Sequence, residues 1–183
     1  MSLKVLLLGL IDITPMPGYD LMKVFDESML FFWHATHTQI YNTLKELEKD
    51  GLVTGEVIQQ TGVPAKKVFS ITEKGKNAIG EWLIVEPEPP GFKHKFLIKL
   101  SFGAKLSDAA LIKQLDRYGE KLRGKLAALM SEKKSVFMDF ARDQREYVLW
   151  ELTFENGMMY YRNELEWVEL AKRRLNQNKE KSI

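Results

Sequence analysis

The sequence contains no cysteine, and this absence removes three kinds of chemistry. Disulfides, thiol nucleophiles and thiolate metal ligands are all excluded. Histidine is scarce as well, and His34, His37 and His94 do not lie at metal-ligand spacing with carboxylates on a common helix face. No phosphate-binding glycine loop, nucleophile elbow or paired-carboxylate motif is found either. We therefore expect no metal, no cofactor and no enzymatic activity.

No uncharged apolar segment approaches the roughly 18 residues that a membrane-spanning helix needs. The most apolar stretch, residues 3–13, holds an apolar run of about seven residues that ends at Asp12, and no small-residue cleavage site follows it. We interpret this stretch as a buried helix rather than a signal peptide. A cytoplasmic protein without a membrane partner is the expectation.

A large charge of one sign is also missing. The chain has a formal net charge of +2, and residues 1–85 hold eight Lys and Arg against ten Asp and Glu, a formal charge of −2. Residues 86–183 hold 19 Lys and Arg against 15 Asp and Glu. If the first half binds nucleic acid, it must do so through the local placement of a few lysines rather than through bulk charge.

Proline is rare, with six residues in the chain, and three of them fall within the short segment 86–91, Glu-Pro-Glu-Pro-Pro-Gly. A proline-rich segment of this kind is typical of a linker between domains. We therefore predict two domains, residues 1–85 and residues 92–183, joined by the linker 86–91.

The pattern in residues 1–85 indicates three helices, a β-hairpin and a fourth helix. The predicted elements cover, in order, residues 3–13, 18–27, 36–50, 52–61, 66–71 and 72–85. The last helix is expected to turn Ala78, Ile79, Trp82 and Leu83 inward. This order is that of a winged helix-turn-helix, which places its third helix in a major groove and its hairpin on a neighbouring groove or backbone.

The third predicted helix has a clear apolar face and a clear polar face. Ile40, Leu44 and Leu47 recur at helical spacing and are expected to be buried. Thr36 and Gln39 fit a capping box at its start. The polar side chains around that start lie at the positive end of the helix dipole, which suits phosphates and base edges.

Several segments of the first half resemble the PadR family of bacterial transcriptional regulators. The segments that carry the resemblance are Gly18-Tyr19-Asp20-Leu21, residues 39–53, residues 66–75 and Trp82. Residues 32–41 and the helical second half are similar to the AphA-like branch of that family. The resemblance implies a mainly α-helical dimer that binds an inverted repeat near a promoter, with the last helix packing against the partner's N-terminal region.

The candidate DNA-binding residues lie on the third helix, at the start of the second and in the hairpin. The lysines are expected to contact phosphates, and the amides of Gln39 and Asn42 can pair with adenine or contact phosphate. Tyr41 is open to two interpretations, a phosphate-contacting hydroxyl or a half-buried core residue. The full set is Tyr19, Thr36, His37, Thr38, Gln39, Tyr41, Asn42, Lys45, Lys66 and Lys67.

The second half is predicted to hold one short helix over residues 92–102 and two long ones, the last over residues 144–176. Fewer than 100 residues cannot cover two such rods alone, so we expect a homodimer. An aromatic stripe on the last helix either fills the dimer interface or binds a small aromatic effector. The residues assigned to dimerisation or effector binding are Leu6, Leu10, Tyr147, Trp150, Phe154, Met158, Tyr161, Leu165 and Val168.

The leading hypothesis is a dimeric, sequence-specific transcriptional regulator, either a repressor or an activator, whose partners are double-stranded DNA and a second copy of the chain. The alternative is a protein-interaction adaptor that uses a winged-helix scaffold without its own operator. The formal charge of −2 on residues 1–85 is the feature that favours the alternative.

Overall fold

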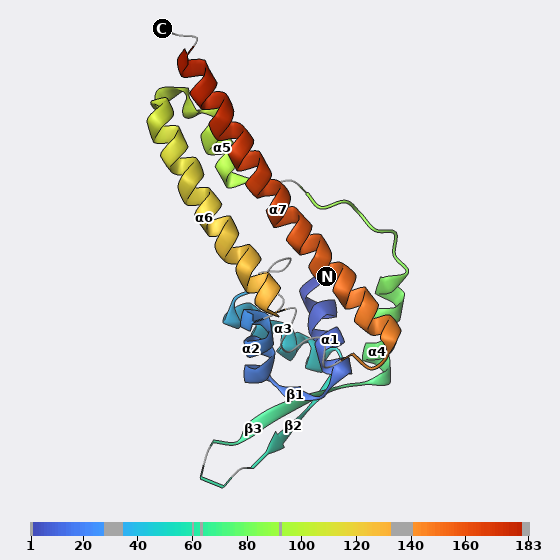
Figure 1. The fold of residues 1–183 in the computed structure, drawn as a ribbon. Helices are drawn as coiled ribbons and strands as arrows, with labels where there is room; N and C mark the ends of the chain where they lie inside the picture. Colours follow the sequence, from blue (N-terminus) through green and yellow to red (C-terminus); the bar gives the residue numbers. More distant parts are fainter. Residues whose placement is uncertain are drawn as a thin grey trace. The chain divides into compact units, whose positions relative to one another are not determined.

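A computed structural model describes residues 2–27, 35–59, 61–62, 64–91, 93–132 and 141–180 (Figure 1). The chain divides into two compact units, Met1–Glu88 and Pro89–Ile183, and the division falls inside the proline-rich segment. Three features of the sequence lie outside the described residues. They are the apolar segment 29–33 with the adjoining His34, the expected start of the short helix at Phe92, and Val136, the last apolar residue that marks the first long helix.

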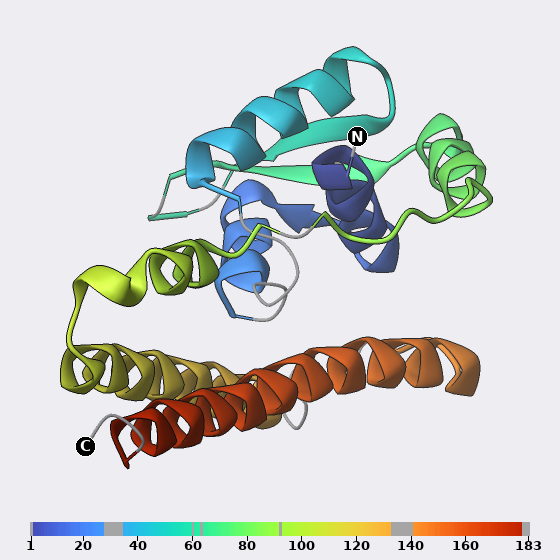
Figure 2. The same cartoon turned by 90° about the horizontal axis from the view of Figure 1, so that it is seen from above.

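The first unit contains four α-helices and three β-strands in its described part, and it confirms the winged-helix prediction. Its elements are α1 (Ser2–Ile13), β1 (Met16–Pro17), α2 (Gly18–Glu27), α3 (His37–Lys49), β2 (Val53–Ile58), β3 (Lys66–Ile71) and α4 (Glu73–Leu83). Figure 2 shows α3 running alongside the β2–β3 hairpin.

The sheet of the first unit has a strand that the sequence pattern did not predict. All neighbours are antiparallel in the order β1-β3-β2, and β1 pairs Met16 with Phe69 and Pro17 with Val68. Pro15 and Pro17 indicate only the end of a helix, because proline lacks the N–H of a regular ladder. At the edge of a sheet that missing N–H is tolerated, so a short strand forms there.

The core of the first unit is built from the apolar faces of its helices. Ile40, Leu44 and Leu47 of α3 are fully buried, as predicted. They share the core with residues from α1, α2 and the sheet, namely Leu7, Leu8, Leu10, Ile11, Leu21, Val53 and Phe69. This packing fixes α3 so that its opposite face points to solvent.

The prediction that Trp82 and Leu83 face the core is wrong. These side chains are 41% and 67% exposed, whereas Ala78 and Ile79 are half-buried. The first turn of α4 lies so close to Leu52, the residue before β2, that a Cβ on Gly75 would be 2.2 Å from the Leu52 carbonyl oxygen. Helical periodicity indicates which face is apolar, but not how many turns the core covers, and here the last turn extends past it.

The second unit is helical, with α5 (Lys95–Ser101), a 3₁₀ turn η1 (Gly103–Lys105), α6 (Asp108–Glu132) and α7 (Gln144–Glu180). The long helices α6 and α7 pack side by side in antiparallel directions (Figures 1 and 2). Their core centres on Leu115, Leu122 and Val168. The two long helices are as predicted, and α5 is shorter than expected because His94 caps it by accepting a hydrogen bond from the Leu97 N–H. Within the described ranges, no helix combines the length and apolar character needed to cross a bilayer.

Candidate nucleic-acid interface

The capping box predicted at the start of α3 is present. The Gln39 N–H donates to Thr36 Oγ1 at 3.3 Å, and Gln39 Oε1 accepts from the Thr36 N–H at 2.8 Å and from its hydroxyl at 3.1 Å. The side-chain oxygen of Gln39 is therefore already engaged. Pairing with both N6 and N7 of an adenine needs that oxygen as well as the amide nitrogen, so Gln39 can offer a base only its Nε2 donor while the cap is intact.

The outer face of α3 presents its remaining candidates to solvent. His37, Thr38, Tyr41, Asn42 and Lys45 are all exposed and lie outside the buried stripe of the helix. Such a face has the dimensions and polarity that fit a B-DNA major groove.

A groove of about 480 Å³ runs between α3, the start of α2 and strand β3. Five of the candidates chosen from the sequence line it, although they come from three separate elements: Tyr19, Tyr41, Lys45, Lys66 and Lys67. The other five, Thr36, His37, Thr38, Gln39 and Asn42, lie on the first turns of α3 and are not part of its described lining. The two groups together form one continuous candidate surface along α3.

Tyr41 is partly packed and partly exposed, so its position is compatible with both a packing role and a phosphate contact. A Cβ on Gly18 would lie 2.9 Å from Tyr41 Cε1, so the ring packs directly on that glycine. The side chain is nevertheless 42% exposed. The ring therefore holds the start of α2 against α3 while part of the residue remains in the groove.

The lysines of the hairpin differ in their partners. Lys67 Nζ lies 2.7 Å from Glu48 Oε2 on α3 and 5.5 Å from the centre of the Phe69 ring. Gly55 leaves the space for this pair, since a Cβ there would be 2.2 Å from Lys67 Cε. Lys66 and Lys45 have no ion pair within the described part of the chain and keep their charge available to a phosphate.

Two acidic side chains near the end of α3 are paired with a lysine that sequence reasoning did not assign to the site. Lys4 of α1 contacts Glu46 at 3.1 Å and Asp50 at 3.2 Å. The hydrogen bond to Glu46, followed by that to Asp50, raises the pKa of the Lys4 ammonium. No local signal could have identified Lys4, because it is more than 40 residues away along the chain. The outer face of α3 is thus less negative than its composition indicates.

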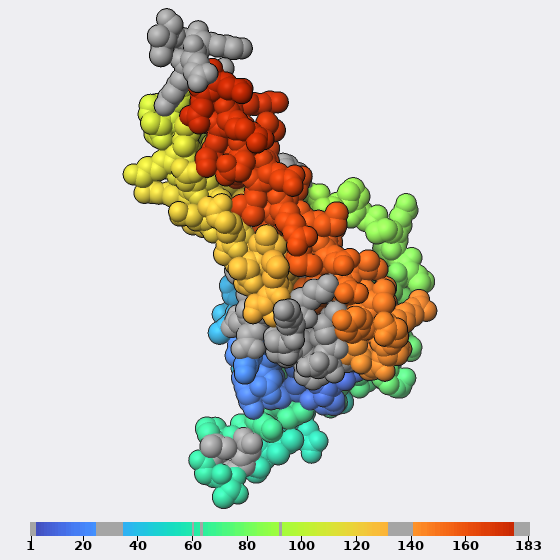
Figure 3. Space-filling view, viewed as in Figure 1, coloured from blue at the N-terminus to red at the C-terminus, as the bar shows by residue number. Residues whose placement is uncertain are grey.

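The hairpin itself projects from the helices of the first unit, as the space-filling view shows (Figure 3). Val57 and Ile58 on β2 are 58% and 39% exposed. A projecting, solvated hairpin is the geometry that a wing needs to contact a backbone beside the groove occupied by α3.

The residues predicted to form an interface or effector site lie on two helices, α1 and α7. On α7, Phe154, Met158 and Val168 are buried, Trp150, Tyr161 and Leu165 are half-buried, and Tyr147 is 36% exposed. On α1, Leu6 is half-buried and Leu10 is buried. These values describe a single chain, so they locate the residues without showing a partner.

Two family models together match most of the chain. Residues 7–81 match the transcriptional regulator PadR-like family, and residues 92–176 match the virulence activator alpha C-terminal family. Among curated proteins, the negative transcriptional regulator PadR of Bacillus subtilis is 37% identical over 106 residues, which span 57% of this chain and 58% of that protein. This alignment therefore covers little more than half of the relative.

Solved structures of the same relative match over almost the whole chain. B. subtilis PadR in complex with operator DNA superposes with a TM-score of 0.82 at 27% identity, covering 96% of this chain and 99% of that one. The complex of PadR with p-coumaric acid gives a TM-score of 0.75 at 26% identity over the same shares of the two chains. The Vibrio cholerae virulence activator AphA gives 0.71 at 25% identity, covering 96% and 98%.

Proposed function

Because this chain belongs to the PadR-like family of transcriptional regulators, with a second half like that of AphA, we propose that it binds an inverted DNA repeat as a homodimer and regulates transcription. The family is one of regulators and not of enzymes. The observation that carries the proposal is the convergence of Tyr19, Tyr41, Lys45, Lys66 and Lys67 on one groove beside the exposed face of α3.

The groove can supply affinity, and the helix can supply sequence preference. Lys45 and Lys66 line the groove and form no ion pair in the described part of the chain, so both charges are available to backbone phosphates. The first turns of α3 carry Asn42 and the Nε2 donor of Gln39, which suit base edges. A second copy of the chain would repeat both sets on the other half of an inverted repeat.

The test is fluorescence anisotropy with a duplex from the region upstream of the chain's own gene. Lys45→Ala and Lys66→Ala are each expected to weaken binding to all duplexes about three- to tenfold, because each removes a phosphate contact. Lys49→Ala is the matched control, since Lys49 lies one turn beyond Lys45 on α3 and is not part of the described groove lining. Equal losses in all three variants would contradict a localised footprint.

The adaptor alternative makes the opposite prediction in the same experiment. The formal charge of −2 on residues 1–85 is the observation that favours it. An adaptor would show no preference for the upstream duplex over an unrelated one, even at low salt.

A small aromatic effector is the second part of the proposal, supported by the PadR complex with p-coumaric acid and by the aromatic residues of α7. Trp150 lies in that stripe and can report binding through its fluorescence. Phenolic acids and cationic dyes are the compounds to screen, with Trp150→Phe as the control. If no compound changes the fluorescence, the rings serve packing alone.

We place the regulator in the cytoplasm because its proposed partner is chromosomal DNA. Cell fractionation with an antibody against the chain tests this placement. Recovery of the protein in the membrane fraction would contradict it.

A further inference from the structure

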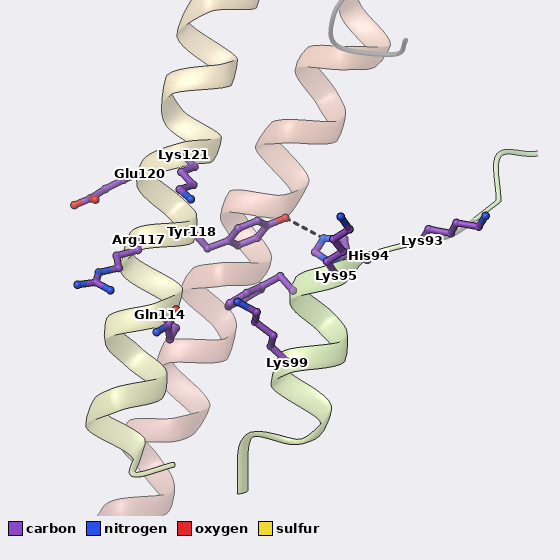
Figure 4. Close-up of a pocket in the computed structure, with 10 residues that line it drawn as sticks. Lys93, His94, Lys95, Lys99, Gln114, Arg117, Tyr118, Glu120 and Lys121 are labelled. Carbon is purple, nitrogen blue, oxygen red and sulfur yellow. Dashed lines mark hydrogen bonds between the residues drawn. The ribbon is translucent and has the colours of Figure 1, made fainter. Parts of the chain in front are cut away.

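The second unit contains a groove of about 670 Å³ between the start of α5 and the middle of α6 (Figure 4). It lies wholly within this unit and shares no residue with the candidate DNA surface. Its lining comprises Lys93, His94, Lys95, Phe96, Lys99, Gln114, Arg117, Tyr118, Glu120 and Lys121.

The lining is strongly cationic. Five of the ten residues are Lys or Arg, and Glu120 is the single acid among those described. In the described part of the chain, none of these five cations forms an ion pair. Elsewhere, Lys4, Lys67, Lys76, Arg142 and Lys172 each have an acidic partner within 3.3 Å.

Unpaired cations that converge on a concave surface create a local positive potential. Low-dielectric walls focus such a field, so the attraction for an anion is larger than on a flat surface of equal charge. Figure 4 shows Lys99 extending from α5 toward α6, and Lys121 beside Tyr118 on α6. In the same view Arg117 and Lys93 extend outward from the groove, so Lys99 and Lys121 bring positive charge to it from two helices while Arg117 and Lys93 lie at its rim.

One wall of the groove is rigid and apolar. The Phe96 and Tyr118 rings are stacked, with centroids 4.5 Å apart and an interplanar angle of 19°. The Tyr118 hydroxyl donates to Glu164 Oε2 at 2.7 Å and lies 2.9 Å from His94 Nε2. Burial, followed by the bond to Glu164, raises the pKa of Tyr118 well above its usual value, so the hydroxyl stays protonated and anchored.

The same network holds the Glu164 carboxylate behind the ring pair and outside the lining of the groove, where its negative charge offsets part of the positive potential. Glu164 is only 13% exposed, and its Oε2 is held by both Tyr118 and His94, the latter at 3.1 Å. Because His94 Nδ1 accepts from the Leu97 N–H, Nε2 carries the proton of the neutral ring. The His94 ring is thus fixed at the junction of α5, α6 and α7, between Lys93 and Lys95.

We propose that this groove binds a small organic or inorganic anion that carries two or more negative charges, such as a diphosphate or a polycarboxylate. Its volume lies in the range of small-molecule sites, and a single acid against five cations favours a multiply charged ligand over a monoanion. The stacked ring pair provides an apolar surface for a carbon skeleton or a base. This site concerns the second unit alone and does not depend on the first unit binding DNA.

Isothermal titration calorimetry of the full chain tests the site with four probes: pyrophosphate, a nucleoside diphosphate, citrate and the monoanion 4-hydroxybenzoate. The multiply charged probes are expected to bind at least about tenfold more tightly than the monoanion. The fluorescence of Trp167 gives a second readout, because its ring meets Phe96 edge to face at 6.3 Å. Absence of binding by every multiply charged probe would overturn the proposal.

The variant Lys95→Ala/Lys99→Ala/Lys121→Ala is expected to lose about tenfold or more in anion affinity. Its matched control is Lys105→Ala/Lys113→Ala/Lys125→Ala, which removes the same charge from exposed positions of this unit outside the described lining. Lys99→Gln alone, expected to lose about threefold, serves if the triple variant does not fold. Equal losses in test and control variants would assign the binding to bulk charge and overturn the site.

The same variants separate a small-molecule site from a second contact with DNA. We expect the triple variant to bind the upstream duplex as tightly as the control variant does. If it instead loses DNA affinity and the duplex displaces pyrophosphate, the groove is a backbone-binding surface and the proposal is wrong.

Discussion

At the scale of single residues, Glu48 forms an ion pair with one of the two hairpin lysines that line the groove. Its carboxylate holds Lys67 at 2.7 Å and itself lines the groove. On the proposed mode of binding, a DNA backbone at the groove would meet Lys67 together with its counter-charge. The wing pair Lys66 and Lys67, which look equivalent in the sequence, therefore carry unequal shares of the proposed phosphate contact.

We predict that Glu48→Gln strengthens binding to any duplex, by about three- to tenfold at low salt. The substitution frees Lys67 and removes an acid from the groove in each subunit, so the slope of log affinity against log salt should steepen by about 0.9 per subunit, or about 1.8 for the dimer. Fluorescence anisotropy over a salt series measures both quantities. Stability should change by less than about 1 kcal/mol, as for other exposed pairs.

Glu46→Gln is the matched control for this prediction. Glu46 is on the same helix and is also paired, but its partner is Lys4 of α1 and it is not part of the described groove lining. An equal gain in affinity from Glu46→Gln would show that overall charge, and not the release of Lys67, is responsible.

Gln39 has two roles that a suitable pair of variants can separate. Its side-chain oxygen completes the capping box, while its Nε2 is the donor left for a base. We predict that Gln39→Glu keeps the cap and the melting temperature but loses preference for the specific duplex. Gln39→Ala should lose both, with a decrease of about 1 kcal/mol in the free energy of unfolding.

Thermal unfolding and the ratio of specific to non-specific affinity are the two measurements. A Gln39→Glu chain that retains native selectivity would show that Gln39 serves the helix cap alone.

The sequence identified most of the candidate surface but not its internal pairing. Ten positions could be selected because polar residues at a helix start and lysines in a hairpin have recognisable chemistry. The links from Lys67 to Glu48 and from Lys4 to Glu46 could not be predicted. Each joins two elements whose relative placement depends on packing, and periodicity carries no information about it.

At the scale of elements, the start of helix α7 is held by hydrogen bonds among Arg142, Asp143 and Glu146. Asp143 Oδ1 accepts from the Glu146 N–H at 2.8 Å. The Glu146 carboxylate accepts from the Arg142 N–H at 2.8 Å and from its guanidinium at 2.9 and 3.2 Å. The side-chain bond to Arg142 is the main cause of the lowered pKa of Glu146.

This lowered pKa gives a pH dependence with a definite sign. Because the folded state favours the ionised carboxylate, the stabilisation is present above the unfolded pKa of about 4.5. It is lost as the pH falls below that value, through the folded pKa. We predict that Glu146→Gln lowers the free energy of unfolding at pH 7 by up to about 1 kcal/mol, and that this difference shrinks toward zero in acid.

Denaturant unfolding at pH 7 and at about pH 3 measures this difference. Glu155→Gln, an exposed position further along α7, is the control for a general effect of helix charge. A Glu146→Gln difference that stays constant across this pH range would contradict the prediction.

Elements with strong periodicity could be predicted from the sequence, and those fixed by tertiary contacts could not. The helices α3, α6 and α7 have apolar stripes, and Thr36 and Ser107 are recognisable caps for α3 and α6. Strand β1 consists of two residues and exists only because β3 is available to pair with it. The exposure of Trp82 likewise depends on where the core ends and not on the pattern of α4 itself.

At the scale of the whole molecule, a net charge of −2 on the first half looks incompatible with DNA binding. The structure does not change this net charge, but it places Lys4 against Glu46 and Asp50 and Lys67 against Glu48, so two lysines offset three acids near α3. The remaining positive charge of Lys45 and Lys66 faces the groove. A small number of well-placed charges, repeated in two subunits, then has to provide the electrostatic affinity.

This arrangement predicts a specific dependence on salt. Two or three lysines in each subunit give a dimer about four to six phosphate contacts, and each contact contributes about 0.9 to the slope of log affinity against log salt. Affinity for an inverted repeat should therefore fall by roughly 10²- to 10³-fold between about 50 and 200 mM salt. A duplex that carries one half-site should show about half of that slope, because only one set of lysines is engaged. Binding that barely weakens over this range, or equal slopes for the two duplexes, would contradict a dimer that holds two grooves against one DNA molecule.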